Sequence, residues 1–230
     1  MKISCINTQE HFKVWIENRR NRVWFSNEKF IKKENLVMSM KEAFDVFFEE
    51  IVKNWLEKRG RRPQIPCRPK DREKYGVLIV DDDSNQGNYV CWKPQLQTKK
   101  IDFEKCEEIL GYEIHPQIKE YVSTYWFVNL EGVIYKEGNR ISLQLNAILP
   151  NYNMEQYIVG SFDNRETHYL IDEEYFLIGT YCSYCGDDSY LVHVDNKTGC
   201  VYIVQVIEQI SIKIADSIEE LLNNMKGIWS

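Results

Sequence analysis

The apolar residues of segment 40–56 constrain the fold more than any other feature of the chain. They recur at intervals of three and four, the spacing that gathers side chains on one face of an α-helix. These residues are Met40, Ala43, Phe44, Phe47, Phe48, Ile51, Val52 and Trp55. Gly60 and Pro63 then provide a helix end. We therefore expect a long amphipathic helix whose aromatic face is buried against a second layer of structure.

Residues 1–38 precede this helix and are expected to form an N-terminal extension. Phe12, Trp15 and Ile16 lie at the spacing of one helix face, and Thr8 can cap the start of that helix. We expect the extension to be helical.

Short β-type and helical segments follow the long helix. Residues 75–80 and 88–92 are rich in β-branched and aromatic side chains and are separated by a turn-forming segment, which predicts a hairpin. Residues 102–110 and 115–121 predict two helices, and proline at the start of the second suits a first helical turn.

The remainder of the chain is predicted to be mostly β. The strand candidates are residues 125–129, 133–135, 141–145, 157–160, 175–179, 190–195 and 200–206. A terminal helix opens at Asp216 or Ser217. Helices, then a meandering antiparallel sheet, then a closing helix predict an α+β fold, with a single domain over residues 39–230.

Charge is divided unevenly along the chain. Residues 1–75 hold 18 Lys and Arg against 11 Asp and Glu, a formal charge of +7, whereas the remaining 155 residues hold 11 against 24, or −13. An acidic body repels the phosphate backbone of nucleic acid and attracts basic molecules. The pattern therefore favours a protein partner with a basic surface and no nucleic acid.

The sequence contains no catalytic or metal-binding motif of diagnostic spacing. The four histidines are scattered, and there is no G-x-S-x-G elbow, P-loop, G-x-G-x-x-G turn or H-E-x-x-H helix. Cys182 and Cys185 could form half of a zinc site or a redox pair, but no second cysteine or histidine pair accompanies them. We expect a non-enzymatic protein without a cofactor or metal. An enzyme that uses clustered carboxylates or this cysteine pair is the remaining alternative.

The cysteine pattern and the N-terminal sequence both favour a cytoplasmic location. The seven cysteines form an odd set without a regular framework, which is typical of reduced thiols. The N-terminus has no signal-peptide pattern, and no apolar run approaches the roughly 20 residues of a membrane span. We therefore expect a cytoplasmic protein.

An ordered series of residues runs from Cys91 to Trp126. It comprises Cys91-Trp-Lys-Pro94, Phe103, Glu107, Leu110-Gly111, Ile114-His-Pro116, Ile118, Tyr121 and Thr124-Tyr-Trp126. The series resembles the Syd family, which belongs to the SUKH superfamily. Further positions that fit the family are Phe44, Trp55, Gly60, Pro63, Leu143, Leu145, Gly160, residues 194–201, Ile218, Leu221 and Leu222. The resemblance covers about residues 40–228 and leaves the N-terminal extension outside it.

The resemblance implies one α+β domain whose sheet curves around a concave face. Syd itself is a peripheral cytosolic protein that associates with the SecY channel through an acidic groove, and many SUKH relatives are immunity proteins that block toxins. The sequence departs from the family where the aromatic strand is followed by glycine and aspartate: here the segment reads Val128-Asn-Leu-Glu-Gly132. Residues that line a groove decide which partner is accepted, so this departure concerns the SecY-specific surface rather than the fold.

Two protein-binding hypotheses follow. The first is an immunity protein that blocks a bacterial toxin through an acidic concave face, and the alternative is a Syd-like protein that binds SecY at the inner face of the membrane. Aromatic rings supply rigid contact area, and carboxylates select a cationic partner. The expected partner-binding residues are Trp92, Glu107, Glu108, Tyr125, Trp126, Asp163 and Glu173.

Overall fold

The computed structural model describes residues 5–8, 11–14, 38–81, 85, 87–136, 138–162, 174–181, 190–205 and 210–227. The chain divides into two compact units, Met1–Val37 and Met38–Ser230. The helices and the large sheet all belong to the second unit.

The first unit contains a small antiparallel hairpin. Strand β1, Cys5–Thr8, pairs with β2, His11–Val14, with Thr8 opposite His11. The prediction of a helix is therefore wrong for β2, where polar and apolar residues alternate as they do in strands. Trp15 and Ile16 lie outside the described residues, so the rest of that predicted helix stays a prediction.

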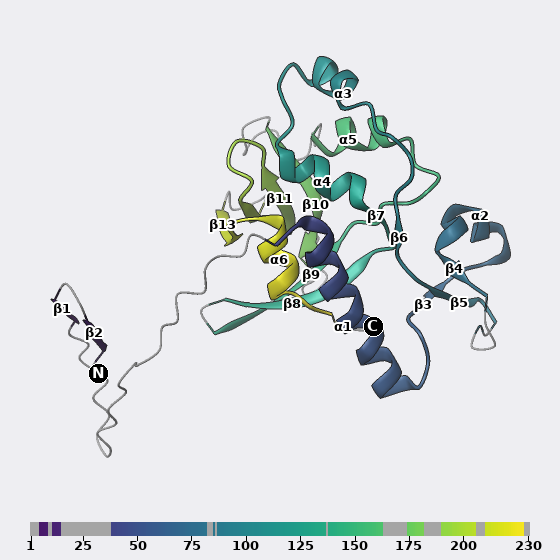
Figure 1. Ribbon diagram of the computed structural model, residues 1–230, viewed down its shortest axis with the longest axis horizontal. Coiled ribbons are helices and arrows are strands. Elements are labelled where there is room, and N and C mark those ends of the chain that lie inside the picture. Colours follow the sequence, from purple (N-terminus) through teal and green to yellow (C-terminus); the bar gives the residue numbers. More distant parts are fainter. Residues whose placement is uncertain are drawn as a thin grey trace. The chain divides into compact units, whose positions relative to one another are not determined.

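The long helix predicted from the aromatic periodicity is α1, Met40–Arg59. Ser39 and Glu42 start it with a capping box, in which each side chain accepts the backbone N–H of the other residue. Gly60 ends it with φ at 65°, a left-handed conformation that suits glycine. The helix contacts α4, Pro116–Thr124, and α6, Ile218–Asn224. Figure 1 shows these three helices in front of the large sheet.

A seven-stranded antiparallel sheet forms the second layer, in the order β13-β12-β11-β10-β9-β8-β14. Its strands are β8 Leu130–Lys136, β9 Asn139–Leu145, β10 Tyr175–Tyr181, β11 Tyr190–Asp195, β12 Val201–Gln205, β13 Ile210–Ala215 and β14 Lys226–Gly227. The predicted strands at 133–135, 141–145, 175–179, 190–195 and 200–206 correspond to five of these, whereas β13 is absent from the sequence prediction.

The large sheet curls strongly. The Lys136 ammonium group of β8 donates a hydrogen bond to the Lys213 carbonyl of β13, although four strands separate β8 from β13 in the sheet order. The buried residues of the sheet join the aromatic face of α1 in one hydrophobic core. The predicted α+β fold with a curved antiparallel sheet is confirmed.

Two smaller sheets lie between α1 and the large sheet in the sequence. Their strands are β3 Gln64–Pro66, β4 Ile79–Val80, β5 Tyr89–Trp92, β6 Gln95–Leu96 and β7 Tyr125–Trp126. Both β3 and β4 pair antiparallel with β5, and β6 pairs with β7. The predicted hairpin of residues 75–80 and 88–92 is confirmed where β4 meets β5. The residues just before β4 are helical instead, in α2, Arg72–Tyr75, and a 3₁₀ turn, Gly76–Leu78.

The helices α3, Phe103–Leu110, and α4 match their predictions, but α5, Met154–Phe162, replaces the strand predicted at 157–160. The β-branched and aromatic run there favours a strand by propensity. The Asn153 side chain instead accepts the Gln156 N–H at 3.1 Å, which stabilises the first turn of a helix. The residues that α5 buries, Met154, Ile158, Ser161 and Phe162, share one helical face.

Candidate functional site

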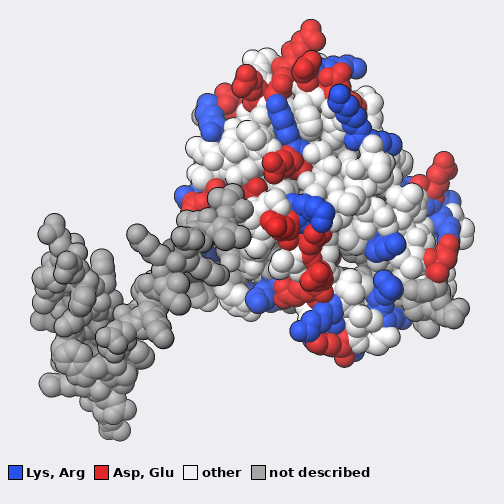
Figure 2. Space-filling view, in the orientation of Figure 1, with Lys and Arg blue, Asp and Glu red and all other residues white. Residues whose placement is uncertain are grey.

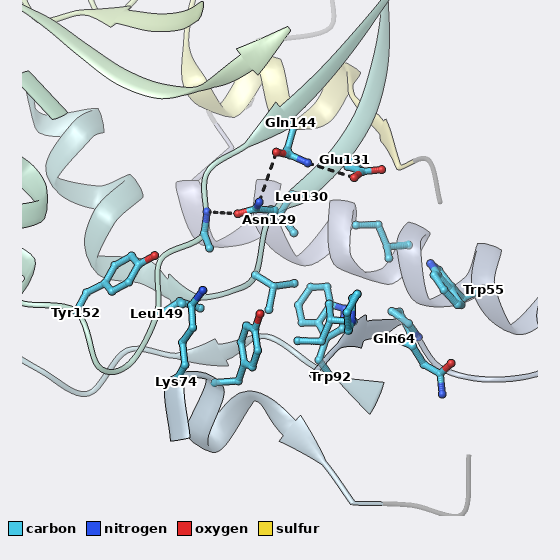
Figure 3. Close-up of a pocket in the computed structure, with 17 residues that line it drawn as sticks. Trp55, Gln64, Lys74, Trp92, Asn129, Leu130, Glu131, Gln144, Leu149 and Tyr152 are labelled. Atoms are coloured by element: carbon cyan, nitrogen blue, oxygen red, sulfur yellow. Dashed lines mark hydrogen bonds between the residues drawn. The ribbon is translucent and has the colours of Figure 1, made fainter. Parts of the chain in front are cut away.

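A cavity of about 300 Å³ lies between α1, the β3-β5-β4 sheet and the start of the large sheet (Figure 3). We call it the Glu131 cavity. Its lining comes from α1, β3, α2, β5, β8, β9, the segment just before β8 and the segment after β9. The volume lies at the lower end of the range for ligand pockets, roughly 300–1,000 Å³, which suits one or two side chains of a partner.

Two tryptophans form the apolar part of the cavity. Trp55, in the last turns of α1, is 9% exposed, and Trp92, at the end of β5, is 6% exposed. The chain turns at Gly60, so β3 returns beside the helix and pairs with β5. The Trp92 N–H donates to the Pro63 carbonyl at 3.0 Å and fixes the strand end that carries this ring. The predicted site residue Trp92 therefore lines the cavity.

Three polar side chains form the opposite wall. Glu131 of β8 lies directly across from Gln144 of β9, and the Gln144 amide nitrogen donates to Glu131 Oε1 at 3.2 Å. The Asn129 amide nitrogen donates to the Gln144 oxygen at 3.4 Å, and its own oxygen accepts the Ala147 N–H at 2.9 Å. Figure 3 shows the three labelled side chains joined by these bonds. The Ala147 N–H thus orients the Asn129 amide, which orients the Gln144 amide, and Gln144 donates to Glu131.

Glu131 is a half-buried carboxylate with no ion pair to any of the described residues. Other carboxylates have such partners: Lys41 lies 2.6 Å from Asp45, and Lys197 lies 3.3 Å from Glu174. A carboxylate partly removed from water and lacking a cation retains a preference for positive charge. The cavity therefore offers a place for a cationic group.

Two tyrosines and one lysine complete the chemistry of the cavity. Burial raises the pKa of the Tyr75 and Tyr152 hydroxyls, so both rings stay neutral at physiological pH. Lys74 is exposed and lies with its ammonium group 5.4 Å from the centre of the Tyr75 ring. The lining therefore combines aromatic faces, one unpaired carboxylate and one exposed ammonium group.

The structure gives Glu107 a different environment from Glu131. Lys119 of α4 lies 2.6 Å from Glu107 of α3, and the Ile114 N–H donates to the same carboxylate at 2.8 Å. Lys119 and the Ile114 N–H hold the pKa of this carboxyl below its usual range. Glu107 is already neutralised inside the protein, which favours a structural role over the predicted contact with a partner.

Three other predicted site residues lie outside the lining of the Glu131 cavity. Tyr125 and Trp126, on β7, are only 8% and 6% exposed and belong to the core, while Glu108 is exposed on α3. Asp163 and Glu173 lie outside the described residues. Partner binding by these five residues stays a prediction.

The described residues contain no group of three or more His, Cys, Asp or Glu side chains that could hold a metal ion. Cys182 and Cys185 lie outside that part of the chain. Among the helices that the structure describes, none is both long and apolar enough to cross a membrane.

Sequence reasoning did not select Glu131, Asn129 or Gln144 as site residues. Glu131 lies opposite Gln144 through the pairing of β8 with β9, and it shares the cavity with Trp92 because two separate sheets border the same cavity. A signal was nevertheless present, because Asn129 and Glu131 belong to the segment 128–132 that departs from the Syd pattern.

Comparison with known proteins identifies the family. The family model described as Syd protein (SUKH-2) matches residues 41–227. Protein Syd of Pseudoalteromonas atlantica is 27% identical over 168 residues, which cover 66% of this chain and 86% of the relative. Protein Syd of Shewanella piezotolerans is 21% identical over 188 residues, covering 82% and 83% of the two chains. The resemblance drawn from the sequence is confirmed, and the chain belongs to the Syd family.

Proposed function

We propose that the protein is a non-catalytic binding module of the Syd type that associates with the cytoplasmic loops of the SecY channel. Membership of the Syd family carries this proposal, since the family model spans residues 41–227 and both relatives are named Protein Syd. A protein acting in this way would be cytoplasmic and peripheral at the membrane. These comparisons favour SecY over the toxin that the sequence hypothesis placed first.

The Glu131 cavity is the proposed contact point for the partner. It combines aromatic faces with a carboxylate that has no ion pair to the described residues, an arrangement that suits the anchoring of a basic segment. Binding by such a surface requires neither a nucleophile nor a metal. The proposal therefore accounts for the site without a catalytic step.

Neutralisation of a basic toxin is the second candidate function. Residues 38–230 hold 21 Lys and Arg against 31 Asp and Glu, a formal charge of −10 that would attract a cationic toxin domain. On the face in Figure 2, carboxylates gather along α1 and over α3 with Lys and Arg among them. A single acidic concave face, which this reading requires, stays a prediction.

Sedimentation with membrane vesicles tests the leading proposal. The full chain is mixed with vesicles enriched in the SecY complex of its own organism and with vesicles of the same lipids alone. We expect SecY-dependent binding that weakens as salt is added, because charged contacts are screened. Equal binding to both vesicles would overturn the SecY proposal. Capture of a small basic toxin domain from the soluble fraction would then support the second candidate.

A further inference from the structure

We propose that the Glu131 cavity binds one arginine side chain of the partner and that this contact decides which partner the chain accepts. The inference rests on the proposed protein-binding function and adds the chemistry of the contact. It concerns residues of a segment in which this chain departs from the Syd pattern, so the family resemblance does not supply it.

Hydrogen bonds orient the Glu131 carboxylate and leave one of its oxygens available to a cation. Glu131 Oε1 accepts one hydrogen bond from the neutral Gln144 amide, and no described residue donates to Oε2. The chain of amides from Ala147 through Asn129 and Gln144 fixes the rotamer of the acid before a ligand arrives. A fixed carboxylate with a free oxygen binds a charged donor with little further loss of side-chain entropy.

The walls of the cavity favour arginine over lysine. A guanidinium group is planar, so it can stack on an aromatic ring while its edge donates to a carboxylate. The Arg59 guanidinium lies 5.2 Å from the centre of the Trp55 ring, so this ring is already close to one guanidinium of the chain. Trp92 and Tyr152 also line the cavity and offer further aromatic surface.

Lys74 limits the site to one cation. Its ammonium group belongs to the lining and is not paired with a carboxylate among the described residues. A second positive group would be repelled there, and the repulsion is modest because Lys74 is exposed and solvent screens its charge. Lys74 and Glu131 therefore have opposite predicted effects on the binding of an arginine probe.

Nuclear magnetic resonance with a small probe tests the inference without the natural partner. The full chain is titrated with N-acetyl-arginine methylamide and, as a neutral control of the same shape, with N-acetyl-citrulline methylamide. Weak binding of the arginine probe should shift the indole N–H signals of Trp55 and Trp92 and the side-chain amide signals of Gln144 and Asn129. The citrulline probe should shift them little.

Two variants give opposite expected results. Glu131→Gln keeps the size and hydrogen-bonding capacity of the side chain but removes its charge, and it should weaken binding of the arginine probe roughly tenfold. Lys74→Ala should strengthen it about twofold, because a like charge is removed. Unchanged signals for folded backbone amides in both variants control for misfolding.

Equal shifts with citrulline, or full probe binding by Glu131→Gln, would overturn the arginine site. Loss of probe binding in Lys74→Ala would also overturn it, since removal of a like charge cannot weaken the binding of a cation at the proposed site. The arginine site and the proposed function can fail separately. Probe binding without SecY-dependent sedimentation would contradict the function, whereas equal SecY-dependent sedimentation by wild type and Glu131→Gln would contradict the site.

Discussion

Lys119 of α4 lies 2.6 Å from the Glu107 carboxylate of α3, and this ion pair joins two helices that adjoin each other along the chain. The Glu107 side chain is 20% exposed, so solvent screens the pair only in part. The pair explains why a glutamate that matches the family pattern is better understood as part of the fold than as part of the binding surface.

Replacing Glu107 by Gln should lower the free energy of unfolding by about 1 kcal/mol, because the ion pair is lost while the contact to the Ile114 N–H can persist. Urea unfolding measures the change. Glu108→Gln on the same helix, whose side chain is exposed, should stay within about 0.5 kcal/mol of the wild type.

The Glu107 contribution also depends on pH. The folded protein holds the pKa of this carboxyl below its ordinary value of 4.5, so folding favours the ionised form. The stabilisation is fully present above that value and is lost as the pH falls through the lower folded pKa. Wild type and Glu107→Gln should therefore converge in stability at strongly acidic pH. A difference that grows on acidification would contradict this explanation.

Removing the Tyr125 hydroxyl should destabilise the fold without affecting partner binding. This hydroxyl donates to the Asp45 carboxylate on α1, and the ring packs against Phe44 and Phe48. Tyr125→Phe should cost about 1–2 kcal/mol in urea unfolding because a partly buried hydrogen bond to a charged group is lost. Tyr135→Phe is the control, since Tyr135 is 66% exposed. Loss of partner binding in Tyr125→Phe at unchanged stability would contradict this explanation and assign Tyr125 to the binding surface.

His193 should make the fold sensitive to mild acid. Its ring is fully buried, neither nitrogen has a hydrogen-bond partner among the described residues, and burial lowers its pKa to about 4. An unfolded histidine binds a proton near pH 6.5, so between these two values unfolding takes up a proton and stability falls as the pH decreases. The loss between about pH 7.5 and about pH 5 should reach about 2 kcal/mol.

His193→Leu tests that assignment, because leucine is of similar size and does not titrate. The difference in unfolding free energy between the variant and the wild type should shift in favour of the variant as the pH is lowered over this range. Other titrating groups affect both proteins alike and cancel in the difference. A difference that does not vary with pH would contradict a buried neutral histidine.

Gly179 should tolerate no side chain, because β10 pairs with β9 there at close range. A Cβ atom at this position would overlap the Gln144 carbonyl oxygen and lie 3.0 Å from Leu145 Cα, both backbone atoms. Gly179→Ala should therefore cost more than about 2 kcal/mol and should disturb Gln144. Gly160→Ala is the matched control: it lies in α5 with nothing within 4 Å of an added Cβ, and should be neutral or stabilising by up to about 1 kcal/mol.

Patterns carried by one segment allowed much of the fold to be predicted. The aromatic face of α1 and the capping residue Ser217 of α6 are such local signals, and both elements form where they were expected. Propensity failed at α5, where the hydrogen bond accepted by Asn153 and the burial of one helical face prevail over β-branched residues. The alternation of Ile210, Ile212 and Ile214 is a strand signal that the prediction overlooked, and it forms β13.

The binding residues were harder to predict because their chemistry depends on three-dimensional neighbours. Glu107 and Glu131 are the same residue type in the sequence, yet Lys119 neutralises the first, whereas the second accepts a hydrogen bond from a neutral amide and pairs with no cation among the described residues. Aromaticity selected Trp92, Tyr125 and Trp126 alike, and all three are buried core residues, but of the three only Trp92 also lines the cavity. Ion pairing and position at the cavity, which separate these cases, are properties of the folded chain.

Binding of three proteins to SecY-enriched vesicles at several salt concentrations tests the central claim most directly. The three proteins are the wild type, Glu131→Gln and Glu107→Gln. Each variant lacks one negative charge of the wild type, so the two variants have equal net charge. We predict that Glu107→Gln binds as tightly as the wild type and that Glu131→Gln binds roughly tenfold more weakly with a smaller dependence on salt. Equal binding by Glu131→Gln and the wild type, or selective loss in Glu107→Gln, would contradict partner recognition through the Glu131 cavity.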